Sequence, residues 1–264
     1  MEKVLNTCLV VNTDSSEGQR AMEIFREQYN KAGLTEGAAW ILNNHPVFAE
    51  YLRMGISLFS KERPEYFLVR PALEADFITP EEINKAYPDV VYADAQIAHL
   101  VRSLPSIGEL KWRKQFGYAV MPAPPKAMSL LDIRANNVND FYSRSGGWYA
   151  GRRFASDDET SPGWLAIKKT PVVNSFNREW DSQKRLLLPS ERIPNVAEMS
   201  WFITTYFAVR GVRLFQDVFV RTSSLESDRG PVHVGLFASK GLRVNYSGAQ
   251  ICDGDIGLSA AWNL

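Results

Sequence analysis

The last part of the chain alternates apolar and polar residues at the spacing of short β-strands. In the stretches 231–238 and 241–245, apolar residues recur at every second position, and successive side chains of a strand point to opposite faces. The residues predicted to point into a core are Val232, Val234, Leu242 and Val244. The tripeptide Ser239-Lys240-Gly241 predicts a hairpin turn between the two stretches. A slip of one residue in this register would bury Arg243.

The clearest helix of the chain is predicted to follow Asn195. This residue can cap the first turn, Glu198 stands at the reciprocal position of a capping box, and Gly211 can end the helix. Its apolar residues lie on most sides, which is typical of a helix inside a core. They are Met199, Trp201, Phe202, Tyr206, Phe207 and Val209.

Residues 1–116 are predicted to be mainly helical, with no chemical motif and no assigned role. Capping-box pairs, Thr79 with Glu82 and Ser106 with Glu109, mark the start of two helices in this region. Helical spacing of apolar residues also runs through the stretches 17–31, 36–43 and 47–59.

The pattern changes near Gly117, where strands begin to alternate with loops. Short apolar runs that predict buried strands or extended segments lie at 65–73, 118–121 and 163–167. The stretch 136–161 is polar and contains glycine, which predicts a loop. We therefore predict an α+β protein with a helical region over 1–116 and a second domain over 117–264.

Composition limits the classes of function. The chain has 264 residues, 45% of them hydrophobic, which suffices for a core of its own. Thirty basic and thirty acidic residues cancel, so we predict neither nucleic acid nor an anionic membrane as a partner. Cys8 and Cys252 stand near opposite ends, without the spacing of a metal site or a disulfide framework. We predict no cofactor and no metal.

The sequence also shows no pattern typical of a membrane span or a secretory signal. No apolar run approaches the roughly 18 residues of a membrane-spanning helix, and the start MEKVLNTCLVVNTDSSEG is too short and too polar for a secretory signal. The sequence therefore predicts no membrane span and a cytoplasmic location by default.

Two stretches resemble a known family. The octapeptide Arg192-Ile193-Pro194-Asn195-Val196-Ala197-Glu198-Met199 precedes an aromatic helix that ends at Arg210-Gly211. It resembles the C-type-lectin-like fold, in the branch that formylglycine-generating enzymes share with the variable proteins of diversity-generating retroelements. The usual pattern there is Arg-Leu-Pro-Thr-x-Ala-Glu-Trp, from which Ile193, Asn195 and Met199 depart. Arg221-Thr222-Ser223-Ser224 and the closing Gly257-Leu258-Ser259-Ala260-Ala261 resemble the final strands of the variable proteins.

For a variable protein, the resemblance implies a ligand-binding face over about 221–258 that retroelement mutagenesis diversifies at adenine-containing codons. Such codons generate residues that include His, Leu, Arg, Asn, Tyr, Ser and Ile, but not Lys, Gln, Glu, Met or Trp. Lys240 and Gln250 would therefore be fixed. The positions that fit, and that we predict to face solvent, are Arg229, His233, Leu236, Ala238, Arg243, Asn245, Tyr246, Ser247, Gly248, Ala249, Ile251, Cys252 and Gly254.

The residue types point to binding independently of the family. A mixture of Tyr, Ser, Gly and Asn is typical of an antibody paratope, and Leu236, Ile251 and Cys252 on glycine-rich loops suit contact with a macromolecule. We predict a receptor-like or adhesin-like protein, not an enzyme, whose partner is an unknown protein or cell-surface ligand.

Three alternatives stay open. A formylglycine-generating enzyme uses closely placed cysteines in its C-terminal half, where this chain has only Cys252. Calcium binding by Asp228, Asp253 and Asp255 would lack the Glu-Pro-Asn, Gln-Pro-Asp and Trp-Asn-Asp signatures of sugar-binding lectins. The third alternative is a phage-derived structural or adhesion protein.

Overall fold

The computed structural model describes residues 66, 69–142 and 146–262 of the chain. The helices predicted over 17–31, 36–43 and 47–59 therefore lie outside the described residues. The chain divides between Pro71 and Ala72, and nearly all described residues belong to the unit that begins at Ala72. Helix α6 (Val69–Leu73) spans this boundary. The helices that follow it are α7 (Pro80–Ala86), α8 (Asp94–Arg102) and α9 (Ile107–Gln115).

The unit begins well before Gly117, where the sequence pattern changes. The reason is a contact between its first residues and the first strand: Ile78 N donates a hydrogen bond to Val120 O at 2.9 Å, and Phe77 forms a parallel bridge with Val120. The capping boxes predicted at the starts of α7 and α9 are present. The strand or extended segment predicted over 65–73 is wrong for Val69–Leu73, which form the helix α6.

The unit is a mixed α+β structure with two four-stranded sheets. The first sheet has the order β1-β2-β8-β3 and pairs antiparallel throughout. Its strands are β1 (Tyr118–Pro122), β2 (Trp164–Lys168), β3 (Glu191–Arg192) and β8 (Ala261–Trp262). The end of the chain thus supplies a strand to the sheet that β1 and β2 begin.

The second sheet has the order β6-β5-β4-β7. Its strands are β4 (Phe219–Leu225), β5 (Pro231–Ala238), β6 (Gly241–Tyr246) and β7 (Ile256–Leu258). β5 lies antiparallel to β4 and β6, whereas β7 runs parallel to β4. The predicted hairpin is confirmed, since Ala238 pairs with Gly241 across a two-residue turn. The four predicted inward residues of β5 and β6 are all buried.

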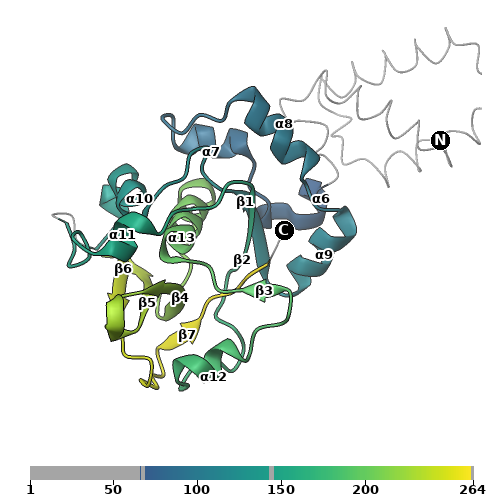
Figure 1. Cartoon of the computed structure of the whole chain (residues 1–264). Helices are drawn as coiled ribbons and strands as arrows, with labels where there is room; N and C mark the ends of the chain where they lie inside the picture. The colour runs from purple at the N-terminus through teal and green to yellow at the C-terminus, as the bar shows by residue number, and fades with distance from the viewer. Residues whose placement is uncertain (1–65, 67–68, 143–145, 263–264) are drawn as a thin grey trace, which may run out of the picture. The chain divides into compact units, whose positions relative to one another are not determined.

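Helix α13 (Val196–Arg210) lies between the two sheets and packs against β2, β4 and β5 (Figure 1). The predicted Asn195–Glu198 capping box and the left-handed Gly211 at its end are both present. All residues from Val196 to Tyr206 are buried, which explains why the helix is apolar on most sides. The remaining helical elements are α10 (Leu130–Asn136), α11 (Arg153–Asp157), α12 (Trp180–Lys184) and the 3₁₀ turns Glu74–Asp76, Val138–Asp140 and Ser227–Arg229.

The two motifs singled out in the sequence lie side by side. Val196 N donates to Ser224 Oγ at 2.9 Å, and Ser223 N donates to Pro194 O at 3.0 Å. Arg192 forms a two-pronged ion pair with the buried Glu198, at 2.6 and 2.8 Å. Glu198 thereby serves both as the helix cap and as the partner of a cation.

Strand β5 contains a bulge that moves two residues out of register. The pairing with β6 shifts between Gly235 and Ala238, and Leu236 has a φ of 45°. Gly235 has a φ of 153°, and a Cβ atom there would lie 2.2 Å from Val218 O. Only glycine fits this close approach, and the bulge redirects the Leu236 side chain.

We expect Gly235→Ala to destabilise the protein by at least about 2 kcal/mol, because the new methyl group must displace the backbone at Val218. Gly108→Ala is the matched control: a Cβ atom at Gly108, in α9, would meet nothing within 4 Å, and alanine favours a helix by up to about 1 kcal/mol. Urea unfolding of both variants measures the two opposite changes. Equal effects would contradict this account of the bulge.

Candidate functional site

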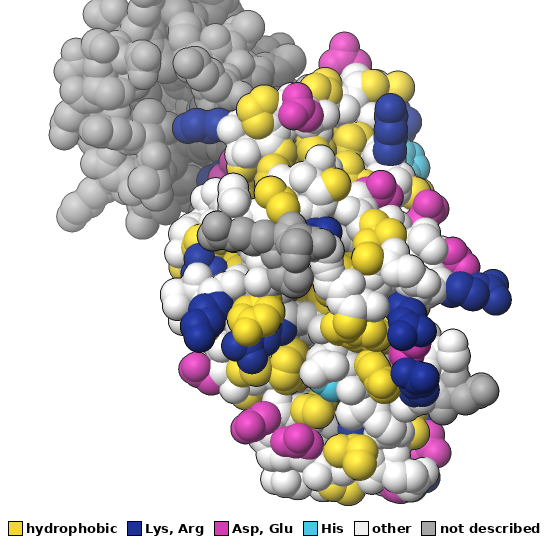
Figure 2. Space-filling view, turned by 90° about the vertical axis from the view of Figure 1, so that its left-hand side faces the viewer, with side chains coloured by type: hydrophobic (Ala, Val, Ile, Leu, Met, Phe, Trp, Pro, Cys, Tyr) yellow, Lys and Arg dark blue, Asp and Glu magenta, His cyan; other side chains and the backbone are white. Residues whose placement is uncertain are grey.

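A cavity of about 280 Å³ opens on the second sheet, where β4, β5 and β6 meet the loop 247–255. Its walls come from three strands, the loop and the first residue of β7. The lining residues are Phe219, His233, Leu236, Asn245, Tyr246, Ser247, Ile251, Asp253, Asp255 and Ile256. The face that carries β5 and β6 interleaves hydrophobic and basic side chains, with acidic side chains along its lower part (Figure 2).

The loop 247–255 is held to the sheet by a buried arginine beneath it. Arg221, on β4, is fully buried, and its Nη2 donates to Ile251 O at 2.6 Å and to Ser247 Oγ at 3.4 Å. Its Nη1 donates to Gln183 Oε1 at 2.9 Å and to Arg178 O at 3.1 Å. One guanidinium group therefore ties the loop and the α12 region to the same strand.

Main-chain hydrogen bonds add to this attachment. Trp180 N donates to Ala249 O at 2.8 Å, and Asn177 N donates to Asp253 O at 2.9 Å. Within the loop, Asp255 N donates to Asp253 Oδ1 at 2.8 Å, the pattern of an Asx turn. The loop 247–255 is thus attached to the rest of the fold at several points, although it contains no strand or helix.

His233 does not face solvent as predicted; its side chain is only 2% exposed. His233 and Arg221 are cross-strand partners, so their side chains lie on one face of the sheet. The loop and the α12 region cover that face. The ring packs edge-on against Phe219, with centroids 4.6 Å apart. Nδ1 of His233 is buried and has no hydrogen-bond partner within the described part of the chain. Burial, and then the neighbouring Arg221, lower the pKa of His233 to about 4.

An aromatic cluster supports one side of the opening. The rings of Tyr246 and Trp148 lie 5.0 Å apart, and Trp148 Nε1 donates to Val244 O at 2.8 Å. Arg229 donates to the Tyr246 hydroxyl at 3.3 Å. These contacts hold the tyrosine in place and so reduce the conformational entropy that a ligand would have to restrict.

The other predicted positions are spread around the cavity rather than inside it. Arg243 lies over the Tyr142 ring at 4.3 Å, and Arg229 reaches the cavity only through Tyr246. Apart from His233, every predicted position is exposed or partly exposed. The predicted positions that do not line the cavity are Arg229, Ala238, Arg243, Gly248, Ala249, Cys252 and Gly254.

Sequence reasoning missed four lining residues. Phe219 and Ile256 carry no signal of function, because an apolar strand residue is equally compatible with a core. Asp253 and Asp255 stand inside the predicted face, but the sequence pattern connects them only with calcium binding. The sequence did contain a signal for these two residues. They stand two positions apart in a turn-rich loop, next to predicted contact residues, which indicates a place in the binding face.

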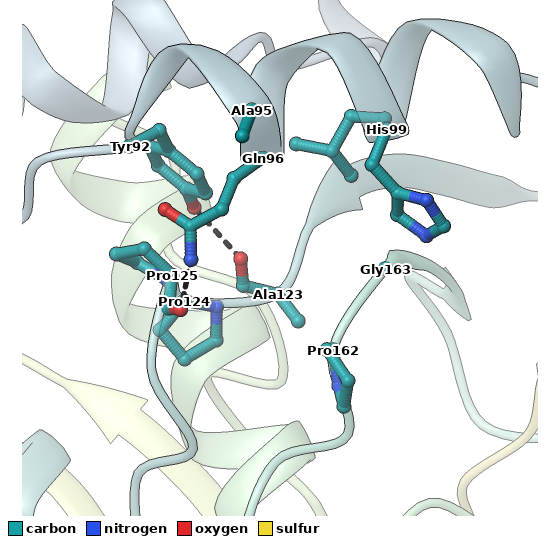
Figure 3. A pocket seen from close by; sticks show the side chains of 10 residues that line it. Tyr92, Ala95, Gln96, His99, Ala123, Pro124, Pro125, Pro162 and Gly163 are labelled. Atoms are coloured by element: carbon teal, nitrogen blue, oxygen red, sulfur yellow. Dashed lines mark hydrogen bonds between the residues drawn. The ribbon is translucent and has the colours of Figure 1, made fainter.

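A second cavity, of about 230 Å³, lies between α8 and the proline-rich segment that follows β1. Two polar side chains of its lining donate hydrogen bonds to the opposite wall: Tyr92 OH donates to Ala123 O at 2.8 Å, and Gln96 Nε2 donates to Pro125 O at 2.6 Å (Figure 3). These bonds join the two walls to each other. This geometry is that of a packing gap, so we take the cavity on the second sheet as the candidate site.

Within residues 66, 69–142 and 146–262, no group of three His, Cys, Asp or Glu side chains could hold a metal ion. None of the helices described there is long and apolar enough to cross a bilayer. No protein-family model, no curated protein and no solved structure matches this chain.

The buried histidine predicts a pH dependence of stability. Since the pKa of His233 falls from 6.5 to about 4 on folding, the unfolded chain takes up a proton first as the pH falls. Stability is therefore lost from about pH 6.5 downward. Between roughly pH 7 and pH 5, the wild type should lose about 2 kcal/mol more unfolding free energy than His233→Gln. Urea titrations at both pH values test this, and parallel losses in the two proteins would contradict it.

Proposed function

We propose that the protein binds a macromolecular ligand, a protein or a cell-surface component, through the face that surrounds the cavity on the second sheet. The observation that carries this proposal is the cavity itself. It is concave, it combines apolar and polar side chains, and its loop is fastened by the buried Arg221. A rigid scaffold that presents loop residues is the usual arrangement of a recognition site.

We further propose that this unit has a C-type-lectin-like fold and that a retroelement diversifies its face. Two observations support the proposal. The motifs around Asn195 and Arg221, which carry the resemblance, contact each other through Val196 and Ser224. All but one of the predicted variable positions are exposed or partly exposed, so most of their side chains could be replaced without disturbing the core. Ala249 is an exception, because it packs against the buried cluster that contains Trp180 and Leu258. His233, which is buried, would be a fixed position under this proposal.

Among the residues that the structure describes, no contact favours the enzyme alternative over this proposal. Cys252 is exposed and free, and it lies outside the lining of the cavity. His233, whose ring does line the cavity, is held away from solvent, with a pKa of about 4. At neutral pH, a histidine with such a pKa is a poor general base for a thiol.

Substitution within the face should change binding without changing stability. Peptides selected on the full chain from a random-sequence display library serve as probes. We expect Asn245→Trp to weaken the binding of most of these peptides by at least about tenfold, because the larger side chain fills the cavity opening from an exposed strand position. The unfolding free energy should change by less than about 0.5 kcal/mol. Asn136→Trp, on the exposed end of α10, is the matched control. If most selected peptides bind both variants equally, the proposed site is wrong.

Diversification is tested by the DNA around the gene. We expect a reverse-transcriptase gene nearby and a second copy of the 3′ end whose differences fall at adenines. Differences spread evenly over all four bases, or the lack of any second copy, would refute the retroelement and leave the ligand-binding proposal untouched.

A further inference from the structure

We propose that the loop 247–255 is an acid-sensitive part of the structure: when His233 takes up a proton, the loop opens while the two sheets and α13 stay folded. The opening removes one wall of the cavity on the second sheet. Acid would therefore weaken ligand binding, a consequence that rests on the proposed function. The inference follows from the exposure of the loop, from the bonds that hold it and from the groups buried beneath it.

The loop 247–255 covers His233 without being buried itself. Each of its residues is exposed or partly exposed, and it contains no strand or helix. Its side-chain bonds to the sheet come from Arg221, whose Nη2 donates to Ile251 O at 2.6 Å and to Ser247 Oγ at 3.4 Å. Segments with few buried contacts open at a lower free energy than the whole fold.

The α12 region, which is the other cover, is held more firmly. Trp180 belongs to a buried cluster that includes Leu258 of β7, and Gln183 Nε2 donates to Ile256 O at 3.1 Å. From the loop, Ala249 packs against this cluster, but it is only partly buried. Of the two covers, the loop is therefore the one that opens first.

A proton on His233 would have no acceptor while the loop is closed. Nδ1 of His233 is buried without a hydrogen-bond partner among the described residues, and so is Nε of Arg221, its cross-strand partner. A protonated imidazole carries N–H groups on both nitrogens. Protonation would thus add a buried, unsatisfied donor beside one that exists already, and such a donor is costly.

The charges around His233 also oppose a second cation. Arg221 is fully buried on the same face of the sheet, and like charges in a poorly solvated site repel each other strongly. Asp253 acts in the opposite direction, but its Oδ1 already accepts from Asp255 N. Burial, and then Arg221, outweigh Asp253 and lower the pKa of His233 to about 4.

The charged and titratable groups that face this site come from three elements. They are Arg221 on β4, Arg178 before α12, and Cys252, Asp253 and Asp255 in the loop, while β6 and α12 contribute the uncharged Asn245 and Gln183.

Acid therefore favours the open loop. Once the loop has moved away, His233 is solvated and its pKa returns toward 6.5, whereas the pKa in the closed form is about 4. The open form takes up the proton first as the pH falls. The equilibrium constant for opening should rise below about pH 6.5, level off below about pH 4, and increase about twentyfold between pH 7 and pH 5.

Hydrogen exchange of single amides, followed by NMR on the full chain, measures this opening. The amides of Asn177 and Trp180 report on the loop, because they donate to its carbonyl groups. The amides of Phe202 and Ile203, inside α13, report on global unfolding. We expect the loop reporters to have lower protection factors than the α13 amides at every pH. Their protection factors should fall about twentyfold from pH 7 to pH 5.

His233→Gln should keep the protection of the loop reporters nearly constant between these two pH values. The matched control is His99→Gln, at an exposed position of α8, which should behave like the wild type. If His233→Gln does not fold, the wild-type profile still decides, because uptake of one proton requires a slope of nearly one decade per pH unit around pH 5. A flat profile, an equal fall in His233→Gln, or equal protection of the loop reporters and α13 would overturn the inference and leave the proposed function standing.

Ligand binding tests the connection to function separately. The probe is a peptide that was selected on the full chain and whose binding depends on Asn245. At about 100 times its Kd at pH 5, it should raise the protection factors of the loop reporters about a hundredfold, because it binds the closed loop. A bound peptide that leaves these protection factors unchanged would overturn the proposed site and leave the acid-sensitive opening standing.

Discussion

The guanidinium group of Arg221 is the contact on which the C-terminal part of this protein depends. A buried cation is costly unless its donors are satisfied. Here four acceptors from the α12 region and the loop 247–255 satisfy the two Nη atoms, while Nε has no partner among the described residues. The main chain of Arg221 meanwhile pairs with His233 on β5 and Leu258 on β7. If any of these segments moved away, the Arg221 guanidinium group would lose hydrogen-bond acceptors or become exposed to solvent. The loop is therefore fastened directly to the sheet beneath it.

This arrangement separates two tasks within one short stretch of chain. Inward residues such as Val232 and Val234 pack against α13, which fills the space between the sheets. Residues on the opposite face of the sheet surround a cavity, and the loop that closes it is braced through Arg221 rather than through a core of its own. A site built in this way can change its exposed side chains, at positions such as Asn245, while the groups that fix its shape stay constant. That property is useful to a protein that recognises varied ligands.

The sequence pattern of β5 wrongly predicts that His233 is exposed. Alternation correctly placed Val232 and Val234 inside, and it therefore placed His233 outside. The face opposite the core is not solvent at this point, because the loop 247–255 returns over it. A pattern of period two reports which residues share a face but not what covers that face. The same limit hid Phe219 and Ile256, whose apolar side chains line the cavity instead of the main core.

The local structural features could be predicted from the sequence alone. The capping boxes at Thr79, Ser106 and Asn195, the helix end at Gly211 and the hairpin after Ala238 depend on residues a few positions apart, so the sequence determines them. The cavity does not follow from such local rules. It requires β7 to join β4 in parallel and the loop to fold back onto a buried arginine, contacts whose partners lie 30 or more residues apart. Only the tertiary structure decides these pairings, because long-range packing selects among folds that are equally compatible with the local pattern.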